Sequence, residues 1–337
     1  MTGAIIGCGR IVLEHHIPAW QTLGRGVVAN WAVADVSSES RFTAQLALGI
    51  PNEHAYRDYR ALLLREKPNF VVIATPHVSH ASIAVDCLRC GVPVLLEKPM
   101  AATLSAAERI TKAAEEMKLP LAVIHNYRQR PQAVLARRLL REGAIGKPFL
   151  FRTEALGMGW SPGAAGFDRD WRTRQAVAGG GCLLDNGYHA VYMARDFLGA
   201  VDSVYARVCT CNRDIETDDT AVLLLNHASG ATTSVQAAWS LAGDSVPVNE
   251  VYGTDGTLRL EPDGTVAVSR LGRDWERHAA HPEPGFLQTF QNFIAYLRGE
   301  EQPATSGRDA LGILRIVRAA YASGESGAVV KVAEYAE

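Results

Sequence analysis

The chain has 337 residues, a length that favours two domains over one. Its 34 basic and 36 acidic side chains leave a formal net charge of −2, so no basic surplus is present to attract nucleic acid. No apolar run approaches the ~20 residues of a membrane-spanning helix. Residues 1–7 also lack the basic stretch and apolar segment of a signal peptide. We therefore expect a cytoplasmic protein that binds neither nucleic acid nor membranes.

Short β-rich runs alternate with amphipathic stretches through the first 124 residues. Strands are predicted at residues 4–6, 28–34, 70–74, 92–96 and 121–124. Helices are predicted near residues 10–23, 38–48, 58–66, 79–90 and 104–117. Strands separated by helices of this kind are joined by right-handed crossovers. The pattern predicts an α/β domain with a doubly wound parallel sheet over residues 1–124.

From about residue 125 the pattern changes to segments that alternate apolar and polar residues. Helices are predicted at residues 132–142, 286–298 and 307–323, with an irregular stretch at 156–181. Strands are predicted at residues 148–155, 201–209, 220–226, 232–238, 248–252, 257–260 and 266–269. Short turns separate most of these strands, as hairpins require. Residues 125–337 are therefore expected to form an α+β domain with a large, open, mostly antiparallel sheet.

The six cysteines raise the question of a metal or redox site. Cys87 and Cys90 have the spacing of such a pair, but Cys209 and Cys211 are too close together to supply a second pair of the usual kind. Cys87 and Cys90 also lie within a predicted helix. We expect buried or half-buried free thiols and no metal.

A glycine-rich turn follows the first predicted strand. Gly7-Cys8-Gly9-Arg10-Ile11-Val12 opens the first helix, where backbone N–H groups and a helix N-terminus can meet a pyrophosphate. Asp35 ends the second strand, at the distance expected for a carboxylate that binds the adenosine ribose. Together they predict a Rossmann dinucleotide-binding domain, with Gly7, Gly9, Arg10, Ile11 and Asp35 at the cofactor.

The choice between NAD and NADP also depends on Asp35. Its carboxylate would repel a 2′-phosphate, and Val36 follows where NADP enzymes often have a basic residue. Ser37, Ser38 and Arg41 are close enough in sequence to keep NADP open as the less favoured alternative. NAD is the expected cofactor.

Further motifs follow later strands in a fixed order. Thr75-Pro76-His77-Val78-Ser79-His80 comes after the strand at 70–74, and Glu97-Lys98-Pro99 after the strand at 92–96. Later the chain reads Gly143-Ala144-Ile145-Gly146-Lys147-Pro148, Asp170-Trp171-Arg172 and Gly179-Gly180-Gly181-Cys182-Leu183-Leu184-Asp185-Asn186-Gly187-Tyr188-His189. Over essentially the whole chain this series resembles the glucose–fructose oxidoreductase and inositol dehydrogenase family, Gfo/Idh/MocA. His77 departs from the family's usual Asn, and Tyr192 stands where many members have Asp.

The resemblance implies a dehydrogenase that acts on a secondary alcohol of a sugar, aminosugar or inositol, in either direction. Asp185 and His189 are four residues apart, so on a helix they share one face. His189 is expected to accept the hydroxyl proton, while Asp185 orients the imidazole and stabilises its charged form. The resemblance implies that Lys98 contacts the reacting hydroxyl and the nicotinamide ribose, where its charge stabilises alkoxide character.

The remaining polar and aromatic residues complete the predicted site. Thr75, Pro76, His77, His80 and Glu97 are assigned to the cofactor side, with Glu97 holding Lys98 or its loop. The substrate is expected to lie among Lys98, Asp185, His189 and a wall formed by Tyr127, Trp160, Trp171 and Arg172. Aromatic residues suit the C–H face of a pyranose ring.

Two other functions remain open on the sequence alone. Some relatives use bound NAD for transient oxidation followed by elimination, which cleaves a glycoside without net redox change. A non-catalytic nicotinamide-sensing regulator on the same scaffold is the second alternative, although the joint presence of Lys98, Asp185 and His189 disfavours it. The resemblance also implies that the open sheets pack face to face, so a homodimer or homotetramer is expected.

Overall fold

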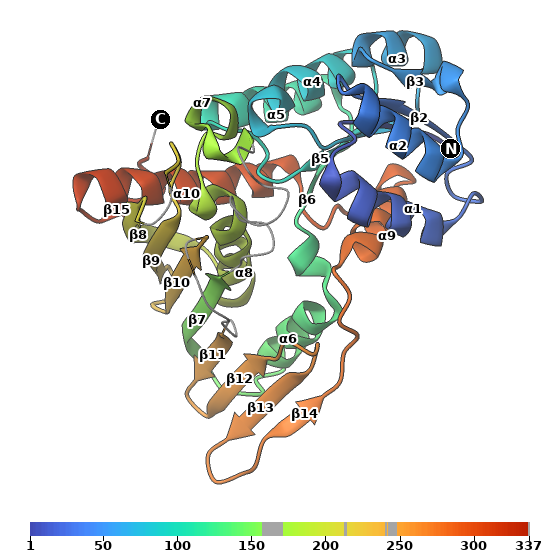
Figure 1. Cartoon of the computed structure of the whole chain (residues 1–337). Coiled ribbons are helices and arrows are strands. Elements are labelled where there is room, and N and C mark those ends of the chain that lie inside the picture. The colour runs from blue at the N-terminus through green and yellow to red at the C-terminus, as the bar shows by residue number, and fades with distance from the viewer. Residues whose placement is uncertain (157–170, 212–213, 240, 242–247, 336–337) are drawn as a thin grey trace. The chain divides into compact units, whose positions relative to one another are not determined.

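The computed structural model describes residues 1–156, 171–211, 214–239, 241 and 248–335 (Figure 1). Two compact units are present. The first comprises Met1–Ala101, Ser105–Asn126 and Phe286–Leu311, and the second comprises Ala102–Leu104, Tyr127–Gly285 and Gly312–Glu337. A single boundary was expected between residues 124 and 125, whereas the chain also passes between the units at 101–105 and returns to the first unit at Phe286.

A six-stranded parallel sheet forms the centre of the first unit, in the order β3-β2-β1-β4-β5-β6. This is the doubly wound arrangement that the sequence predicted. Its strands are β1 (Thr2–Ile6), β2 (Asn30–Ala34), β3 (Ala55–Tyr56), β4 (Phe70–Ile73), β5 (Val94–Glu97) and β6 (Leu121–Ile124). Its helical segments are η1 (Val12–His16), α1 (Ile17–Leu23), α2 (Ser38–Leu48), η2 (Asn52–His54), α3 (Tyr59–Glu66), α4 (His77–Arg89), α5 (Leu104–Met117) and α9 (Phe286–Leu297).

Helix α9 completes the core on one face of this sheet. Phe286, Phe290 and Phe293 are buried together with residues of β1, β4, α1 and α2. Trp20 of α1 stacks on Phe290 with ring centroids 4.3 Å apart and an interplanar angle of 7°. Aromatic pairs at such distances stabilise the folded state beyond the contribution of their buried apolar area. A segment from the end of the chain thus supplies part of the hydrophobic core of the nucleotide-binding unit.

The second unit contains a nine-stranded mixed sheet in the order β14-β13-β12-β11-β7-β10-β9-β8-β15. Its strands are β7 (Pro148–Leu156), β8 (Val201–Cys209), β9 (Thr220–His227), β10 (Thr232–Ala238), β11 (Asn249–Gly253), β12 (Gly256–Leu260), β13 (Val266–Arg270), β14 (Glu276–His278) and β15 (Val330–Lys331). All pairings are antiparallel except β7 with β10. The predicted large, mostly antiparallel sheet is confirmed.

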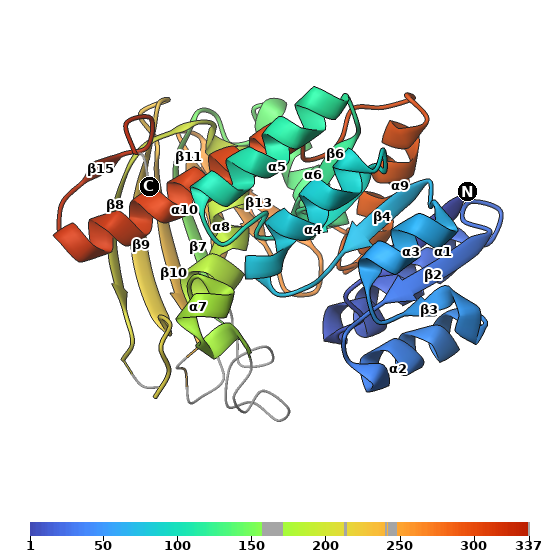
Figure 2. The same cartoon turned by 90° about the horizontal axis from the view of Figure 1, so that it is seen from above.

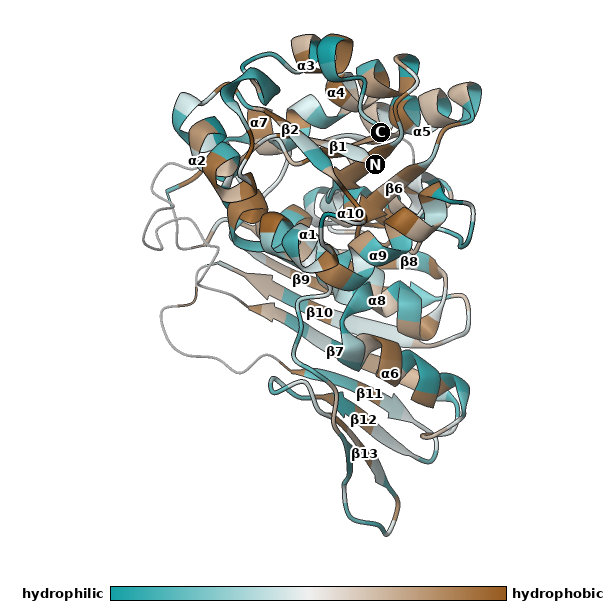
Figure 3. Ribbon diagram, turned by 90° about the vertical axis from the view of Figure 1, so that its right-hand side faces the viewer, coloured by the Kyte–Doolittle hydropathy of each residue, from teal (hydrophilic) through white to brown (hydrophobic). Residues whose placement is uncertain are grey.

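Helical segments of the second unit pack on one face of that sheet (Figure 2). They are η3 (Asn126–Gln129), α6 (Pro131–Arg141), η4 (Trp171–Thr173), α7 (Gln175–Ala178), η5 (Leu183–Gly187), α8 (Tyr188–Leu198) and most of α10 (Gly307–Ser326). Polar and apolar residues alternate along the strands, visible as bands on β10 (Figure 3). Among the described residues no helix covers the opposite face, where Tyr205, Val222 and Leu224 are each close to half exposed.

Several elements differ from the predicted ranges. The helix expected at 10–23 consists of the π turn η1 followed by α1, and the strands β3, β14 and β15 were not predicted because each has only two or three residues. Cys87 lies on α4 and Cys90 directly follows that helix; both are free thiols, the first buried and the second exposed. No helix of the described residues has the length and apolar character needed to cross a membrane.

Candidate active site

The turn after β1 has the geometry that a dinucleotide requires. Gly7 has φ +91°, and a Cβ there would lie 2.5 Å from the carbonyl oxygen of Ala74, so only glycine fits. At Gly9 a Cβ would meet nothing within 4 Å, which leaves this backbone open to a ligand. The helical segment that begins directly afterwards presents its N-terminus at the same edge of the sheet. These residues fit a bound pyrophosphate.

Asp35 connects the end of β2 to this turn. One carboxylate oxygen accepts the N–H of Cys8 at 2.6 Å, and the other accepts the N–H of Ser37 at 2.8 Å. Arg41 donates to the backbone carbonyl of Asp35 at 2.6 Å. Because β1 and β2 are neighbours, the carboxylate and the glycine turn lie at the same edge of the sheet. This is the arrangement in which a carboxylate receives a ribose hydroxyl.

His80 joins the loops that follow β4 and β5. Its Nε2 lies 2.7 Å from the carbonyl oxygen of Thr75, and its Nδ1 lies 3.0 Å from that of Pro99. Burial lowers the pKa of His80 below its ordinary value, although two carbonyl oxygens favour the protonated form. His80 therefore links the two loops through their backbone carbonyl groups.

Glu97 holds the backbone of Lys98. Its Oε2 accepts the N–H of Lys98 at 3.0 Å, while its Oε1 lies 2.7 Å from Nε2 of the buried His16. The Lys98–Pro99 peptide bond is cis. Glu97 is itself buried, so it acts here through the loop that carries Lys98.

The other predicted cofactor residues lie at the same edge of the first sheet. Ile11 follows the glycine turn, and the exposed Arg10 pairs with Glu14 at 2.6 Å. Thr75 and Pro76 directly precede α4, and the buried His77 is its first residue. Since β2, β1, β4 and β5 are consecutive in the sheet, their carboxyl ends bring all these loops together.

In the second unit, His189 lies on α8 between two tyrosines. Its Nδ1 lies 2.6 Å from the hydroxyl oxygen of Tyr192, one turn along the helix. Its ring stacks on Tyr127 at 4.0 Å with an interplanar angle of 17°. The Tyr192 hydroxyl also accepts the backbone N–H of Tyr127 at 3.1 Å. Burial holds the pKa of Tyr192 well above its ordinary value, so its phenol is neutral.

Asp185 forms an ion pair that the sequence did not suggest. Its Oδ2 lies 3.3 Å from Nε of Arg172, whose guanidinium lies over the ring of Trp171. Residues 183–187 form the π turn η5, so Asp185 lies in a π turn and His189 in the α-helix that follows it. The structure thus gives the orienting contact at His189 Nδ1 to Tyr192, a residue that the sequence marked only as a departure from the family pattern.

The three glycines before Asp185 make room for protein rather than for a ligand. A Cβ on Gly181 would lie 1.9 Å from the carbonyl oxygen of Asp218, and one on Gly180 would lie 2.4 Å from the hydroxyl of Tyr321. Asp218 accepts the N–H of Gly181 at 2.6 Å and that of Leu183 at 2.8 Å. Asp218 thus anchors the start of this segment, a contact that no sequence pattern had indicated.

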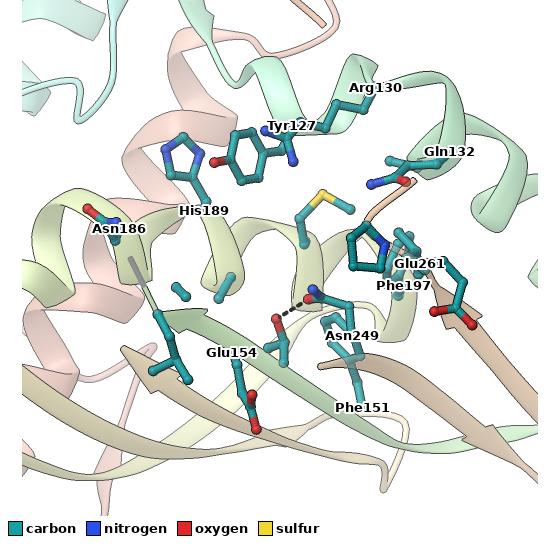
Figure 4. A pocket seen from close by; sticks show the side chains of 18 residues that line it. Tyr127, Arg130, Gln132, Phe151, Glu154, Asn186, His189, Phe197, Asn249 and Glu261 are labelled. Carbon is teal, nitrogen blue, oxygen red and sulfur yellow. Dashed lines mark hydrogen bonds between the residues drawn. The ribbon is translucent and has the colours of Figure 1, made fainter. Parts of the chain in front are cut away.

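A cavity of about 340 Å³ adjoins His189 within the second unit (Figure 4). Its walls come from η3, α6, η5, α8, β7, the strands β11 and β12 and the residues that follow β12. Apolar side chains such as Met193 and Phe197 line one part, and Tyr127, Arg130 and Gln132 line another. Trp160, expected in the substrate wall, lies outside the described residues. No group of three or more metal-ligating side chains occurs among the described residues.

These two units have the fold and the residues of a nicotinamide-dependent oxidoreductase. Family models agree with that assignment over most of the chain. Residues 1–125 match the oxidoreductase family with the NAD-binding Rossmann fold, and residues 134–259 match the GFO/IDH/MocA C-terminal domain. The chain belongs to the Gfo/Idh/MocA family of oxidoreductases.

Individual relatives extend the match to nearly full length. A D-apiose dehydrogenase of Paraburkholderia graminis is 33% identical over 98% of this chain and 89% of its own length. An inositol 2-dehydrogenase of Rubrobacter xylanophilus is 28% identical over 82% of this chain and 79% of its own length. The structure of an Agrobacterium radiobacter oxidoreductase in complex with NAD+, L-tartaric acid and magnesium has a TM-score of 0.88 and 26% identity, covering 99% of this chain and 98% of that chain.

Proposed function

We propose that this enzyme oxidises a secondary alcohol of a small sugar or cyclitol with a nicotinamide cofactor, or reduces the corresponding ketone. The observation that carries the proposal is the half-buried imidazole of His189, fixed through Nδ1 beside a cavity of about 340 Å³. That volume lies at the lower end of the roughly 300–1,000 Å³ of small-molecule sites. Relatives named for apiose and inositol support the substrate class.

His189 acts as the proton acceptor at Nε2. Since the Tyr192 hydroxyl engages Nδ1 at 2.6 Å, the opposite nitrogen is the one directed to proton exchange. Stacking on Tyr127 fixes the plane of the imidazole. When Nε2 takes the proton, Nδ1–H can donate to the Tyr192 oxygen, which stabilises the charged ring. A neutral phenol thus orients the imidazole at Nδ1.

Lys98 and Asp185 supply charge to the same reaction. The Lys98 ammonium stabilises the alkoxide character of the substrate oxygen as its proton leaves. Asp185, paired with Arg172, completes the polar surface on the substrate side. When bound, the nicotinamide accepts or supplies the hydride. NAD is preferred over NADP, because the Asp35 carboxylate accepts hydroxyl hydrogen bonds and repels a phosphate.

A substrate screen tests this function. NADH formation is followed with D-apiose, other free pentoses and hexoses, and inositols, and products are identified by mass to separate oxidation from elimination. His189→Ala should lower turnover by about 10²–10⁴-fold, the range for loss of a general acid–base residue. Its NAD affinity should stay at the wild-type value. His281→Ala, at an exposed histidine of the same unit, serves as the control.

Two results would contradict the proposal. Absence of NADH formation with every sugar and cyclitol would remove the substrate class. Wild-type turnover in His189→Ala would remove His189 from the chemistry, and a product of cleaved mass would replace oxidation by elimination.

A further inference from the structure

Two polar side chains that border the cavity lack partners for one atom each. Nε of Arg130 and Oε1 of Gln132 are shielded from solvent, and neither has a hydrogen-bond partner among the described residues. Both residues line the cavity, as Figure 4 shows. Buried polar groups in folded proteins are almost always hydrogen-bonded, so an unpaired donor and an unpaired acceptor at one cavity indicate a missing partner.

Arg130 is placed beside the proposed proton acceptor by Tyr127. Its Cζ lies 3.3 Å from the centroid of the Tyr127 ring, and the His189 ring centroid lies 4.0 Å from it. Two groups this close to one ring centre cannot occupy the same face without overlapping, so the ring lies between them. Figure 4 shows the imidazole and the guanidinium on either side of Tyr127. Arg130 therefore lies on the opposite face of the Tyr127 ring from the imidazole.

The carboxylates in the cavity wall are engaged elsewhere. Glu154 pairs with Arg152 at 3.0 Å and accepts the N–H of Val248 at 3.1 Å. Glu261 lies 3.7 Å from Arg259. Among the described residues, no ion pair links either carboxylate to Arg130. The guanidinium is thus available to a ligand.

The chemistry of the two unpaired atoms restricts that ligand. Arg130 Nε–H can only donate, and Gln132 Oε1 can only accept. A carboxylate or phosphate accepts the hydrogen of Arg130 Nε but is repelled by Gln132 Oε1. An ammonium donates to Gln132 Oε1 but is repelled by the Arg130 guanidinium. A hydroxyl group both accepts and donates, so hydroxyl groups of one polyol can satisfy both atoms.

We propose that Arg130 and Gln132 form a diol subsite, which binds neighbouring hydroxyl groups of the substrate remote from the carbon that reacts at His189. The inference rests on the proposed function and deepens it: the substrate is a free, neutral polyol of monosaccharide size. Sugar acids are disfavoured because Gln132 Oε1 offers no hydrogen to a carboxylate oxygen.

Calorimetric titration tests the subsite separately from catalysis. D-Apiose, D-xylose and myo-inositol are titrated into enzyme saturated with NADH, which cannot accept a hydride from an alcohol, followed by mono-deoxy analogues of each polyol that binds and by D-xylonate. Arg130→Met, Arg130→Lys and Gln132→Leu are compared with the wild type. Arg130→Lys keeps a cation near Tyr127 without the Nε–H, and Arg138→Met, at an exposed position on α6, is the matched control.

Each subsite variant should raise the Kd of the bound polyol about 10- to 100-fold, the range for one charge-assisted or buried hydrogen bond, and leave the NAD affinity unchanged. The mono-deoxy analogue that loses the relevant hydroxyl should bind wild type correspondingly weakly, and bind the Gln132→Leu variant as well as the parent polyol does.

Four results separate the two proposals. If the wild type binds a polyol, the variants do not, and the screen shows no NADH formation, the subsite stands and the dehydrogenase function is overturned. Turnover of polyols with an unchanged Kd in all three variants would overturn the subsite alone. Binding of none of the three polyols overturns the subsite, and tighter binding of D-xylonate than of D-xylose overturns its assignment to hydroxyl groups.

Discussion

Tyr192→Phe is the sharpest test of how His189 is held. The change removes one oxygen from a side chain that is 1% exposed, and that oxygen contacts both His189 Nδ1 and the backbone N–H of Tyr127. Leaving one or both groups unpaired should lower the free energy of unfolding by about 1–3 kcal/mol. An imidazole displaced by about 1 Å costs on the order of 10²-fold in rate, so turnover should fall by about that factor.

A positioning role predicts a pattern that a structural role does not. Steady-state kinetics should show a lower kcat with nearly unchanged KM for the sugar and unchanged Kd for NAD. Tyr188→Phe makes the same change at another fully buried tyrosine of α8. Equal losses in both variants, or a wild-type kcat in Tyr192→Phe, would refute the reasoning.

Three other properties follow from particular contacts. Asp35→Ala should weaken NAD binding about 10- to 100-fold and NADP binding less, because a charged hydrogen-bond acceptor is lost. Paired titrations in which the variant keeps its preference for NAD would contradict the assignment of Asp35. Burial lowers the pKa of His80 in the folded state, so the folded state binds fewer protons, and stability should be present above the unfolded value of 6.5 and fall as pH drops below it. His80→Asn should flatten that slope in melting curves, and an unchanged slope would exclude His80 as a source. Light scattering should find a dimer or tetramer of the 36.4 kDa chain and a monomer for Leu224→Arg on the uncovered sheet face, whereas a monomeric wild type would remove that surface as an interface.

The pattern of apolar and polar residues predicted the architecture because most helices and strands carry one dominant pattern each. Strands such as β4 and β5 are short apolar runs between helices, and β9 alternates buried and exposed residues throughout. The return of Phe286–Leu311 to the first unit could not be predicted in this way. Helix α9 shows an apolar face in its sequence, but nothing local says which of two cores that face enters.

Site prediction depended on where a residue's contacts lie along the chain. Asp35 and the glycine turn were recognisable because strand ends fix their positions. Tyr192 is only three residues from His189, so the helical spacing could have indicated the contact. Asp218 anchors the Gly181 segment across an interval of 37 residues, and such a contact leaves no trace in the local pattern.

The place of α9 has a consequence for how the chain is made. A ribosome releases Trp20 early, yet the ring on which Trp20 stacks, Phe290, emerges some way before the end of synthesis. Until then, the apolar residues of β1, β4 and α1 that pack against α9 have no partner helix. Residues 127–285 have all been synthesised by that time. The nucleotide-binding unit, first to be translated, is thus the one that must wait, and a fragment ending near residue 125 should be prone to aggregation.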